Sequence, residues 1–570
     1  MPAARPPALD YVSPLPPVRS GIADYSVDLL PHLVERAGPG GLRVLRVPGQ
    51  PVDPAVAERF GVVSADERAG AGGTARLALY QMGNNRYHRE VERMALERPG
   101  VLTLHDLVLH HLVSEVHLSE RDFAGYRRRL AADHGWIGEE AARPREWGAV
   151  VEAMLFELPA HRTLLRRQRG VLVHNRWAAE RIAREDPEIR VRVVPMGVPL
   201  PPPADRVRGL AFRRRLGIPD DAPVLGSFGF QTPIKRTARA VEALAAPELS
   251  GAHLLVVGES PRDRRDGDEP ERGELEVLAA ELGVADRVHE TGFVPWGDFE
   301  AGIAACDLCL NLRYPTAGET SASLLRVLAA GRPAVVSDHA QFVELPDEVA
   351  VKVPLGDEEL PALVARLAAL LAAPERLAAM GEEARRHVAR RHDPRAAAAA
   401  VIEACAAWAD AEPPATADTG RPPAVPPPTS RTWSDLSGRL EVDGLEEPWP
   451  DGRRRRLTVH LTNTGRTRWL AAWRGPGGIA LETSLETPRG DLFARRPWLA
   501  LPRDLEPGES HAFTLDVRRP PEPARLRLAV RLLGGVDAPA LSSPPGRSQI
   551  GGSVWEGWLR EESLLEESLG

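Results

Sequence analysis

Short hydrophobic runs alternate with helical patterns along the first third of the chain. The runs over residues 42–197 read LRVLRV, LALYQM, VLTLHD, GVLVHN and VRVVPMG. Apolar residues at helical spacing precede and separate these runs. In the first helical segment, before Leu42, Ile22, Tyr25, Leu29 and Leu33 fall on one helical face. Strands that alternate with amphipathic helices predict a parallel sheet covered by helices.

A second series of the same kind follows a Pro-rich segment at Pro199–Asp205. Its strand-length runs read VLGSFG, HLLVVG, VHETGF, LCLNL and AVVS. We therefore predict an α/β fold with two consecutive Rossmann-like, doubly wound domains. Helical patterns over Glu382–Trp408 close this part of the chain.

The C-terminal part has a different pattern. After a Pro-, Thr- and Ala-rich stretch, alternating runs such as RRLTVHLTNTGRTRW and HAFTLDVRR are separated by turn signals, which predicts an all-β sandwich. The acidic end, EGWLREESLLEESLG, fits either a short docked helix or a frayed tail. The predicted parts are residues 1–200 and 201–410 as Rossmann-like domains, 411–432 as a linker, 433–550 as the sandwich and 551–570 as an acidic tail. The last helices of the second domain are candidates to cross back to the first.

Composition and charge limit the classes of protein that this chain can belong to. With 72 Lys+Arg against 80 Asp+Glu the net charge is −8, so no global basic field is available for a nucleic-acid backbone. Three cysteines cannot form a disulfide framework, and the leader MPAARPPALD lacks the apolar core of a secretory signal. The apolar stretches are too short to cross a bilayer. We expect a cytoplasmic protein with at most peripheral membrane contact.

The segment RYPTAGETSASLLRVLAAGRPAVVSD, residues 313–338, places a Gly-Glu-Thr-Ser loop directly before a helix. Thr320 or Ser321 can cap that helix, and Gly331 with Pro333 ends it. Unpaired amides and the helix dipole at such an end suit a diphosphate. An ordinary capped helix is the alternative reading of this segment taken alone.

Two cations precede another helix. The loop after the strand VLGSFG delivers Lys235 and Arg236 to a helix N-terminus, where the dipole disfavours positive charge. An anionic ligand would relieve this conflict. The alternative is a pair of solvated surface charges. Lys235 and Lys352 are the two lysines of the chain, beside 70 arginines.

These residues carry a resemblance. The series SPLPPVRSGIADYS, YQMGNNRYH, LTLHDLVLHHL, VLVHN, VPMGV, GFQTPIKR, HLLVVGE, TGFVP and GETSASLLRVLAAGRPAVVSD resembles a family-four glycosyltransferase of the GT-B fold, over roughly residues 8–410. The resemblance implies retaining transfer from a nucleotide diphosphate sugar, bound between an acceptor-side first domain and a donor-binding second domain, without an obligatory metal or other cofactor.

The resemblance also implies roles for individual residues. His105, Lys235 and Glu319 take catalytic positions, facing the sugar, the diphosphate and the sugar hydroxyls, and Gly21 lies in the loop near the phosphates. The wider set of donor-binding positions comprises Gly229, Arg236, Val294, Gly318, Thr320, Ser321, Ser323 and Arg326. The chain departs from the common pattern at two points: Arg326 replaces the glutamate that holds the ribose, and Phe230 replaces an arginine, which leaves Arg236 as the substitute cation.

The expected chemistry is electrostatic stabilisation of the departing diphosphate, whose oxygen takes the acceptor proton while His105 positions the sugar or acceptor. The expected acceptor is a glycan, a glycolipid or a metabolite at the inner membrane face. A His105–Asp106 base dyad is disfavoured because adjacent strand residues point to opposite faces. A same-fold epimerase or phosphorylase and a non-catalytic carbohydrate-binding or scaffold protein stay open as alternatives.

Three other motifs have plainer explanations. Cys306 and Cys309 have redox spacing but lie in an apolar run, which favours buried thiols. Asp266-Gly267-Asp268 lies in a charge-rich segment typical of a solvated turn, so no metal site is predicted. Aromatic residues of the sandwich fit core packing better than sugar stacking; they are Trp469, Trp473 and Trp498. The LTNTGRTRW hairpin resembles immunoglobulin-like accessory modules.

Overall fold

The computed structural model describes residues 7–65, 76–142, 152–259, 273–356, 358–414, 429–430, 438–444, 454–471, 478–486, 492–495, 499–518, 524–532 and 554–559. Internal contacts divide the chain into two units. One comprises residues 1–116 and 161–421, and the other comprises residues 117–160 and 422–570. Residues 117–160, which the sequence pattern had placed in the first domain, thus group with the C-terminal part.

The first Rossmann-like domain is built on a seven-stranded parallel sheet with the order β3-β2-β1-β4-β5-β6-β7. Its strands are β1 (Leu9–Val12), β2 (Leu42–Arg46), β3 (Val63–Ser64), β4 (Leu77–Met82), β5 (Val101–Leu104), β6 (Gly170–Val173) and β7 (Val191–Val193). Its helices are α1 (Gly21–Ala37), α2 (Pro54–Phe60), α3 (Arg89–Glu97), α4 (His110–Leu118), α7 (Arg162–Arg166) and α8 (Arg176–Glu185). The central strands are buried on both faces, as the continuous apolar runs predicted.

The second Rossmann-like domain holds a six-stranded parallel sheet with the order β10-β9-β8-β11-β12-β13. Its strands are β8 (Val224–Phe228), β9 (His253–Val257), β10 (Val288–Glu290), β11 (Leu308–Asn311), β12 (Ala334–Ser337) and β13 (Ala350–Val353). Its helices are α9 (Arg206–Arg215), α10 (Thr237–Leu244), α11 (Glu274–Glu281), α12 (Trp296–Ala305), α13 (Ala322–Ala329), α14 (Glu359–Leu371) and α15 (Pro374–Arg391). The predicted pair of doubly wound domains is confirmed.

Each parallel sheet reverses its strand order at one point. The reversal lies between β1 and β4 in the first sheet and between β8 and β11 in the second. In open α/β sheets the crevice outside the carboxyl ends of the strands at such a point is where ligands bind. The loops after β8 and β11 carry Lys235 and the Gly-Glu-Thr-Ser segment.

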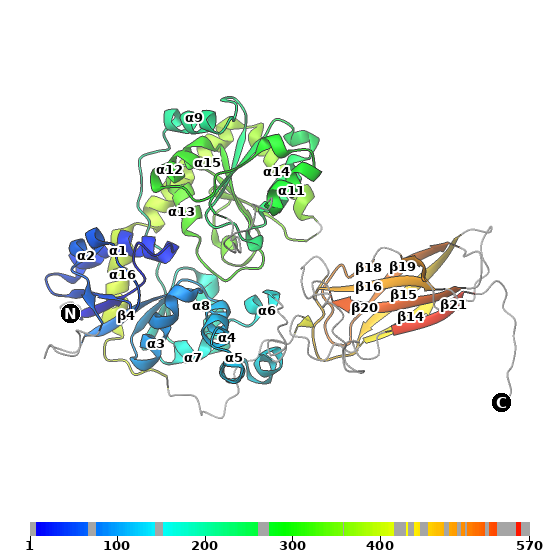
Figure 1. The fold of residues 1–570 in the computed structure, drawn as a ribbon, viewed down its shortest axis with the longest axis horizontal. Coiled ribbons are helices and arrows are strands. Elements are labelled where there is room, and N and C mark those ends of the chain that lie inside the picture. The colour runs from blue at the N-terminus through cyan, green and yellow to red at the C-terminus, as the bar shows by residue number, and fades with distance from the viewer. Residues whose placement is uncertain are drawn as a thin grey trace. The chain divides into compact units, whose positions relative to one another are not determined.

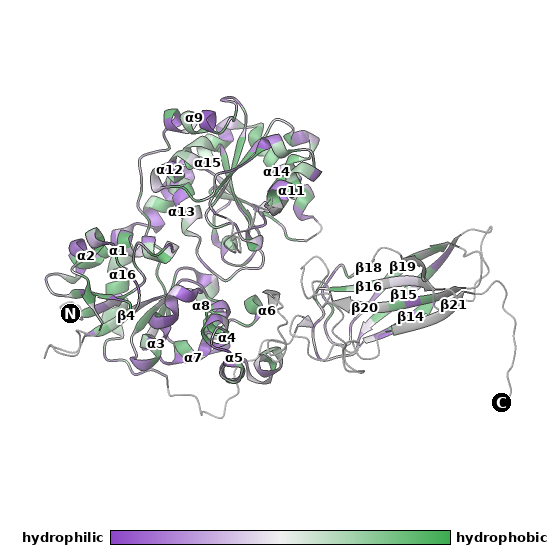
Figure 2. Cartoon of the chain, in the orientation of Figure 1, coloured by the Kyte–Doolittle hydropathy of each residue, from purple (hydrophilic) through white to green (hydrophobic). Residues whose placement is uncertain are grey.

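One helix returns from the second domain to the first. α16 (Pro394–Ala407) packs beside α1 (Figure 1), and Ile402 and Cys405 share a hydrophobic core with Leu29 and Leu33. α9 instead lies at the surface, and Figure 2 shows hydrophilic colour along much of it, as its arginine-rich sequence requires. None of the helices in the described ranges combines the length and apolar character needed to span a bilayer.

The second unit contains the helices α5 (Phe123–Ala142) and α6 (Glu152–Glu157) and two antiparallel sheets. One sheet has the order β14-β15-β19, formed by Gly438–Asp443, Arg454–Asn463 and Ser510–Arg518. The other joins β17 (Leu492–Arg495), β16 (Ile479–Glu486), β20 (Ala524–Leu532) and β21 (Val554–Leu559), and β18 (Leu499–Ala500) also pairs with β16.

Both antiparallel sheets contribute to a single core, which includes Leu457, Val459, Leu481 and Leu528 around the fully buried Trp469. The all-β sandwich is therefore present, and Trp469 is a core residue. Trp473 and Trp498 lie outside the described residues. The strand β21 includes the first residues of the acidic tail and pairs with β20. The rest of the segment for which a helix or a frayed end was considered, residues 560–570, lies outside the described residues. The immunoglobulin-like identity of the sandwich stays a prediction.

The contact between Gly170 and Trp408 offers a test of the returning helix. A Cβ added at Gly170 in β6 would overlap the indole ring of Trp408, which follows α16. We expect Gly170→Ala to lower the free energy of unfolding by ~1–3 kcal/mol through overpacking, measured by urea denaturation. Gly251→Ala, where a Cβ meets open space, is the matched control. A Gly170→Ala cost that is undiminished in a Trp408→Ala background would contradict this packing.

Candidate functional site

Lys235 reaches back to the end of β8. After Phe228 the chain turns through Gly229, whose φ of +86° favours glycine. The turn Pro233–Lys235 directs the Lys235 ammonium to the carbonyl oxygen of Phe228. A Cβ at Gly229 would lie 2.9 Å from Lys235 Nζ and 3.7 Å from Ser323 Oγ. The lysine and the start of α13 therefore meet at Gly229, at the β8/β11 switch point.

The N-terminus of α13 is rich in polar groups. Ser321 is the N-cap, and its Oγ accepts a hydrogen bond of 3.3 Å from the amide of Leu324. The same Oγ lies 3.1 Å from Asn311 Oδ1 and 3.2 Å from Ser323 Oγ. Asn311 Nδ2 is buried and has no hydrogen-bond partner among the described residues. This amide is the kind of orphaned donor that a bound oxyanion satisfies.

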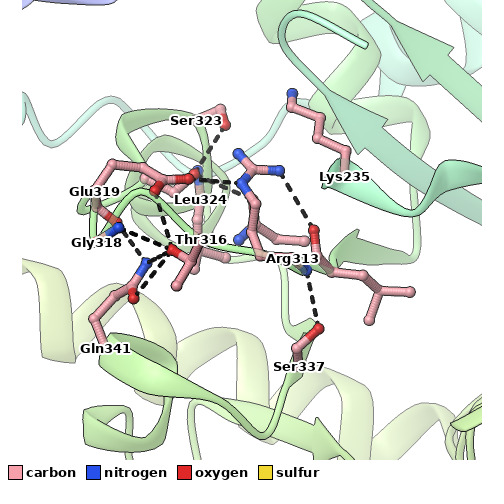
Figure 3. A network of polar contacts seen from close by, with 12 residues as sticks. Lys235, Arg313, Thr316, Gly318, Glu319, Ser323, Leu324, Ser337 and Gln341 are labelled. Carbon is pink, nitrogen blue, oxygen red and sulfur yellow. Dashed lines mark hydrogen bonds and ion pairs between the residues drawn. The ribbon is translucent and has the colours of Figure 1, made fainter. Parts of the chain in front are cut away.

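Glu319 is held in a network beside the lysine (Figure 3). Arg313 Nε donates to Glu319 Oε1 at 2.8 Å, and Thr316 Oγ1 donates to Glu319 Oε2 at 3.1 Å. Gln341 Nε2 donates to the Glu319 carbonyl at 2.8 Å. Burial and the neighbouring Arg313 guanidinium hold the pKa of Lys235 well below its ordinary value, although Glu319 opposes this shift. Glu319 pairs with Arg313 and only partly offsets the cost of charging Lys235, so an added anion would favour the charged lysine.

Residues of the first domain form hydrogen bonds to the Gly-Glu-Thr-Ser loop. Val108 donates its amide to the Ala317 carbonyl at 3.0 Å, and Asn175 Nδ2 donates to the Gly318 carbonyl at 3.0 Å and to Thr320 Oγ1 at 3.1 Å. Gly318 has a φ of +75°, and a Cβ there would lie 2.7 Å from the Cβ of Leu107. The Gly-Glu-Thr-Ser loop is therefore fitted against the carboxyl end of β5.

His105 lies under this surface and is only 5% exposed. Its Nε2 is 3.0 Å from Gln81 Oε1, and its Nδ1 is 3.2 Å from His174 Nε2, while Tyr25 packs edge-on against its ring. Burial, together with the charges of His174 and His88, holds the pKa of His105 well below its ordinary value. Both ring nitrogens of His105 are thus engaged by protein groups.

Asp106, which the sequence analysis considered only as half of a base dyad with His105, lies in the loop after β5. Its Oδ2 accepts a hydrogen bond of 2.8 Å from the Asn84 amide. Burial first, and the Glu319 carboxylate second, raise the pKa of Asp106 to about 7. The signal available in the sequence was its position directly after a buried strand; the partner, Glu319, belongs to the other domain.

Arg236 does not join Lys235 at the anion site. Its guanidinium forms an ion pair with Glu359, a residue of α14 that is only 1% exposed, with Nε donating to Oε1 at 2.6 Å. The expected substitute cation is thus engaged elsewhere in this structure. The physical reason is that a buried carboxylate requires a paired charge, and Arg236 supplies it.

Arg326 and the first-domain helix α1 meet on another side of α13. Arg326 Nη2 lies 2.5 Å from Asp28 Oδ2, and its guanidinium stacks on the Trp296 ring at 4.3 Å. These residues line a pocket of about 590 Å³ together with Asp24, Arg208 and the Pro-rich segment 199–205.

Val294 is partly buried against the core around Phe228. Gly21 begins α1, and a Cβ there would meet open space.

The remaining motifs fall outside this site. Cys306 and Cys309 are buried free thiols, as predicted, and burial raises the pKa of Cys306. Asp266-Gly267-Asp268 lies outside the described residues. Across the described ranges no three His, Cys, Asp or Glu side chains gather in a way that could hold a metal ion.

Comparison with known proteins finds similarity that includes the second domain. Residues 210–387 match the family model described as Glycosyl transferases group 1. D-inositol 3-phosphate glycosyltransferase from Stackebrandtia nassauensis is 40% identical over 164 residues, which are 27% of this chain and 34% of that protein. 2-Deoxystreptamine glucosyltransferase from Streptomyces kanamyceticus is 32% identical over 126 residues, 21% of this chain and 30% of that protein. The matches thus span about a third of these curated relatives.

Two solved structures that resemble this chain have low sequence identity to it. Sucrose-phosphate synthase from Thermosynechococcus elongatus is 19% identical with a TM-score of 0.48, covering 70% of this chain and 97% of that one. HepE from Anabaena, in complex with UDP and glucose, is 15% identical with a TM-score of 0.48, covering 70% and 99%.

The buried histidines predict acid sensitivity. Burial lowers the pKa of His88 and His174 to about 4, so the unfolded chain takes up their protons first as the pH falls. Stability that is fully present above about pH 6.5 is lost on approach to pH 4, at most roughly 3 kcal/mol per histidine. Urea midpoints between pH 7.5 and pH 4.5 should fall less steeply for His88→Gln than for the wild type. The partly exposed His117 gives the control His117→Gln. Identical slopes for all three proteins would contradict this assignment.

Proposed function

We propose that this protein is a retaining glycosyltransferase that moves a sugar from a nucleotide diphosphate sugar to a hydroxyl of a glycan, glycolipid or metabolite, without an obligatory metal. One observation carries the proposal: Lys235 Nζ and the N-terminus of α13 come together at the β8/β11 switch point, opposite the carboxyl end of the first sheet. The group 1 match of residues 210–387 supports the same reaction class.

The diphosphate is the part of the donor that these groups suit best. A dianionic group beside Gly229 would receive the Lys235 ammonium, the Ser323 hydroxyl and the free amides of α13. It would also restore the charge balance of Lys235 and Arg313, whose mutual repulsion disfavours a protonated lysine. As the sugar bond breaks, negative charge grows on the departing phosphate, and preorganised donors stabilise that charge.

The pocket beside Arg326 is the proposed site of the nucleoside. Arg326 lies three residues after Ser323, so both side chains project from the same side of α13, one turn apart. A volume of about 590 Å³ lies in the range of small-molecule sites. Trp296, the first residue of α12, lines this pocket, and Val294 precedes it in the chain. The loop of Gly318, Glu319 and Thr320 then faces the transferred sugar.

Alanine substitutions separate the proposed roles of Lys235 and Arg236. We expect Lys235→Ala to lower donor turnover about a hundredfold, or ~3 kcal/mol, because a preorganised cation is lost from the leaving group. Lys352→Ala is the matched control, since Lys352 pairs with the exposed Asp347. Arg236→Ala should lower stability and leave turnover far less affected, because its partner is Glu359. Release of nucleoside diphosphate from a panel of nucleotide sugars, with thermal unfolding measured in parallel, is the readout.

Turnover of Lys235→Ala within about threefold of the wild type would contradict the assignment of the diphosphate site. A wild-type protein that binds nucleotide sugars without releasing nucleoside diphosphate would instead favour the non-catalytic alternative, to which the arginine at position 326 lends support.

A second experiment tests whether the nucleoside and the diphosphate of the donor bind at separate subsites. We expect Arg326→Ala to weaken binding of UDP or GDP and to leave inorganic pyrophosphate binding within about twofold, because Arg326 faces the nucleoside pocket. Lys235→Ala should weaken both ligands. Isothermal titration calorimetry provides the measurement. Equal losses for pyrophosphate and nucleotide in Arg326→Ala would place Arg326 at the phosphates and contradict the division.

A further inference from the structure

The cavity beside α13 has walls of different polar character. Its volume is about 590 Å³, and its lining includes residues of α1 from the first domain and of α9, α12 and α13 from the second. On the wall that α9 and α12 form, Trp296 Nε1 donates to Glu300 Oε1 at 3.1 Å, and Arg208 Nη1 donates to Glu300 Oε2 at 3.4 Å. These three side chains are therefore paired with one another.

The wall that α1 forms holds two carboxylates with free oxygens. Asp24 and Asp28 are four residues apart on one face of α1, and both line the cavity. Asp28 Oδ2 accepts a hydrogen bond of 2.5 Å from Arg326 Nη2, and its Oδ1 accepts none from any residue that the structure describes. Asp24 forms neither a hydrogen bond nor an ion pair within the described part of the chain. One guanidinium thus serves two carboxylates.

These carboxylates favour a ligand that donates hydrogen bonds. Burial raises the pKa of Asp28, and the Arg326 guanidinium offsets this only in part, so further donors would stabilise the charged form. Ionised carboxylates accept hydrogen bonds without donating any, so the α1 wall attracts hydroxyl groups and repels phosphate groups. The wall therefore suits a part of the donor that carries hydroxyls and no phosphate charge.

The ribose is the part of a nucleotide that has this chemistry and this position. It carries two adjacent hydroxyl groups, and a carboxylate binds a ribose hydroxyl in dinucleotide-binding folds. Ser323, at the proposed phosphate site, lies one helical turn before Arg326 on α13, and the ribose is joined directly to the first phosphate. Trp296 is already stacked with Phe299 and Arg326, so its ring is engaged by protein side chains.

We propose, resting on the glycosyltransferase function above, that Asp24 and Asp28 bind the ribose hydroxyls of the donor and make the site selective for ribonucleotides over deoxyribonucleotides. Arg326 is then a positioning residue, because a guanidinium cannot accept a hydroxyl hydrogen but holds the Asp28 carboxylate that can. The nucleotide contacts the second domain through its phosphates and the first domain through its ribose.

The test compares ribonucleotides with their deoxy analogues. UDP and GDP, each with its 2′-deoxy and 3′-deoxy form, are titrated into the full chain by isothermal titration calorimetry. We expect the wild type to bind UDP or GDP about tenfold more tightly than at least one deoxy analogue, because a hydrogen bond to a charged group is lost. Asp24→Asn should lower this ratio at least about threefold, and the double variant with Asp28→Asn should bring it within about twofold of one. Binding of the deoxy analogue should stay within about threefold of the wild type.

The control is Glu35→Gln, which removes an exposed carboxylate from the same helix and should leave the ratio unchanged. Asp24 also lies in the first turn of α1, where a negative charge stabilises a helix. Thermal unfolding of each variant therefore accompanies the titrations. A role confined to the helix would lower the Tm of Asp24→Asn and leave its ratio at the wild-type value, which would overturn the inference.

The remaining outcomes separate the inference from the function on which it rests. A wild type that binds UDP or GDP no more tightly than either deoxy analogue overturns the ribose assignment and leaves the proposed function intact. Equal losses of ribonucleotide and deoxynucleotide binding in both aspartate variants also overturn it. A wild type that binds none of these nucleotides overturns the proposed function, and this inference with it.

Discussion

The rest of the site depends on the charge of Lys235. This lysine is buried close to Arg313, and the negative charge around it does not compensate for burial and the arginine. Lys235 is held over Gly229 by the carbonyl of Phe228, and the neighbouring Glu319 carboxylate already pairs with Arg313. Desolvation and the arginine both disfavour its charged form. An anion with two or more charges removes this conflict, and the N-terminus of α13 adds dipoles aimed at the same place.

The fold supplies this geometry through the position of the two sheet reversals. β8 and β11 are neighbours in space and are separated along the chain by two further strands, so their loops converge where no connecting helix covers them. The first sheet presents its own carboxyl edge, and hydrogen bonds from Val108 and Asn175 fix the Gly-Glu-Thr-Ser loop against it. The returning helix α16 and the Arg326–Asp28 pair join the domains elsewhere.

The sequence predicted the parts of the site that local patterns encode. The strand–loop–helix pattern placed Lys235 before a helix, as the structure has it. The capping pattern offered Thr320 or Ser321 as the cap of α13, and the structure has Ser321. The sequence could not predict ion pairs between residues far apart in the chain. Glu359 is 123 positions from its partner Arg236, and Asp28 is 298 positions from its partner Arg326. The sequence disfavoured a His105–Asp106 dyad because adjacent strand residues point to opposite faces. The electrostatic interaction of Asp106 with Glu319 of the other domain has no signature in local spacing.

The most direct test of the account is a crystal structure of the protein with a nucleoside diphosphate that raises its Tm. The account predicts the two phosphates within hydrogen-bond distance of Lys235 Nζ, Ser323 Oγ and the first amides of α13, with the lysine released from the Phe228 carbonyl. A diphosphate bound elsewhere, with Lys235 still on that carbonyl, would contradict it.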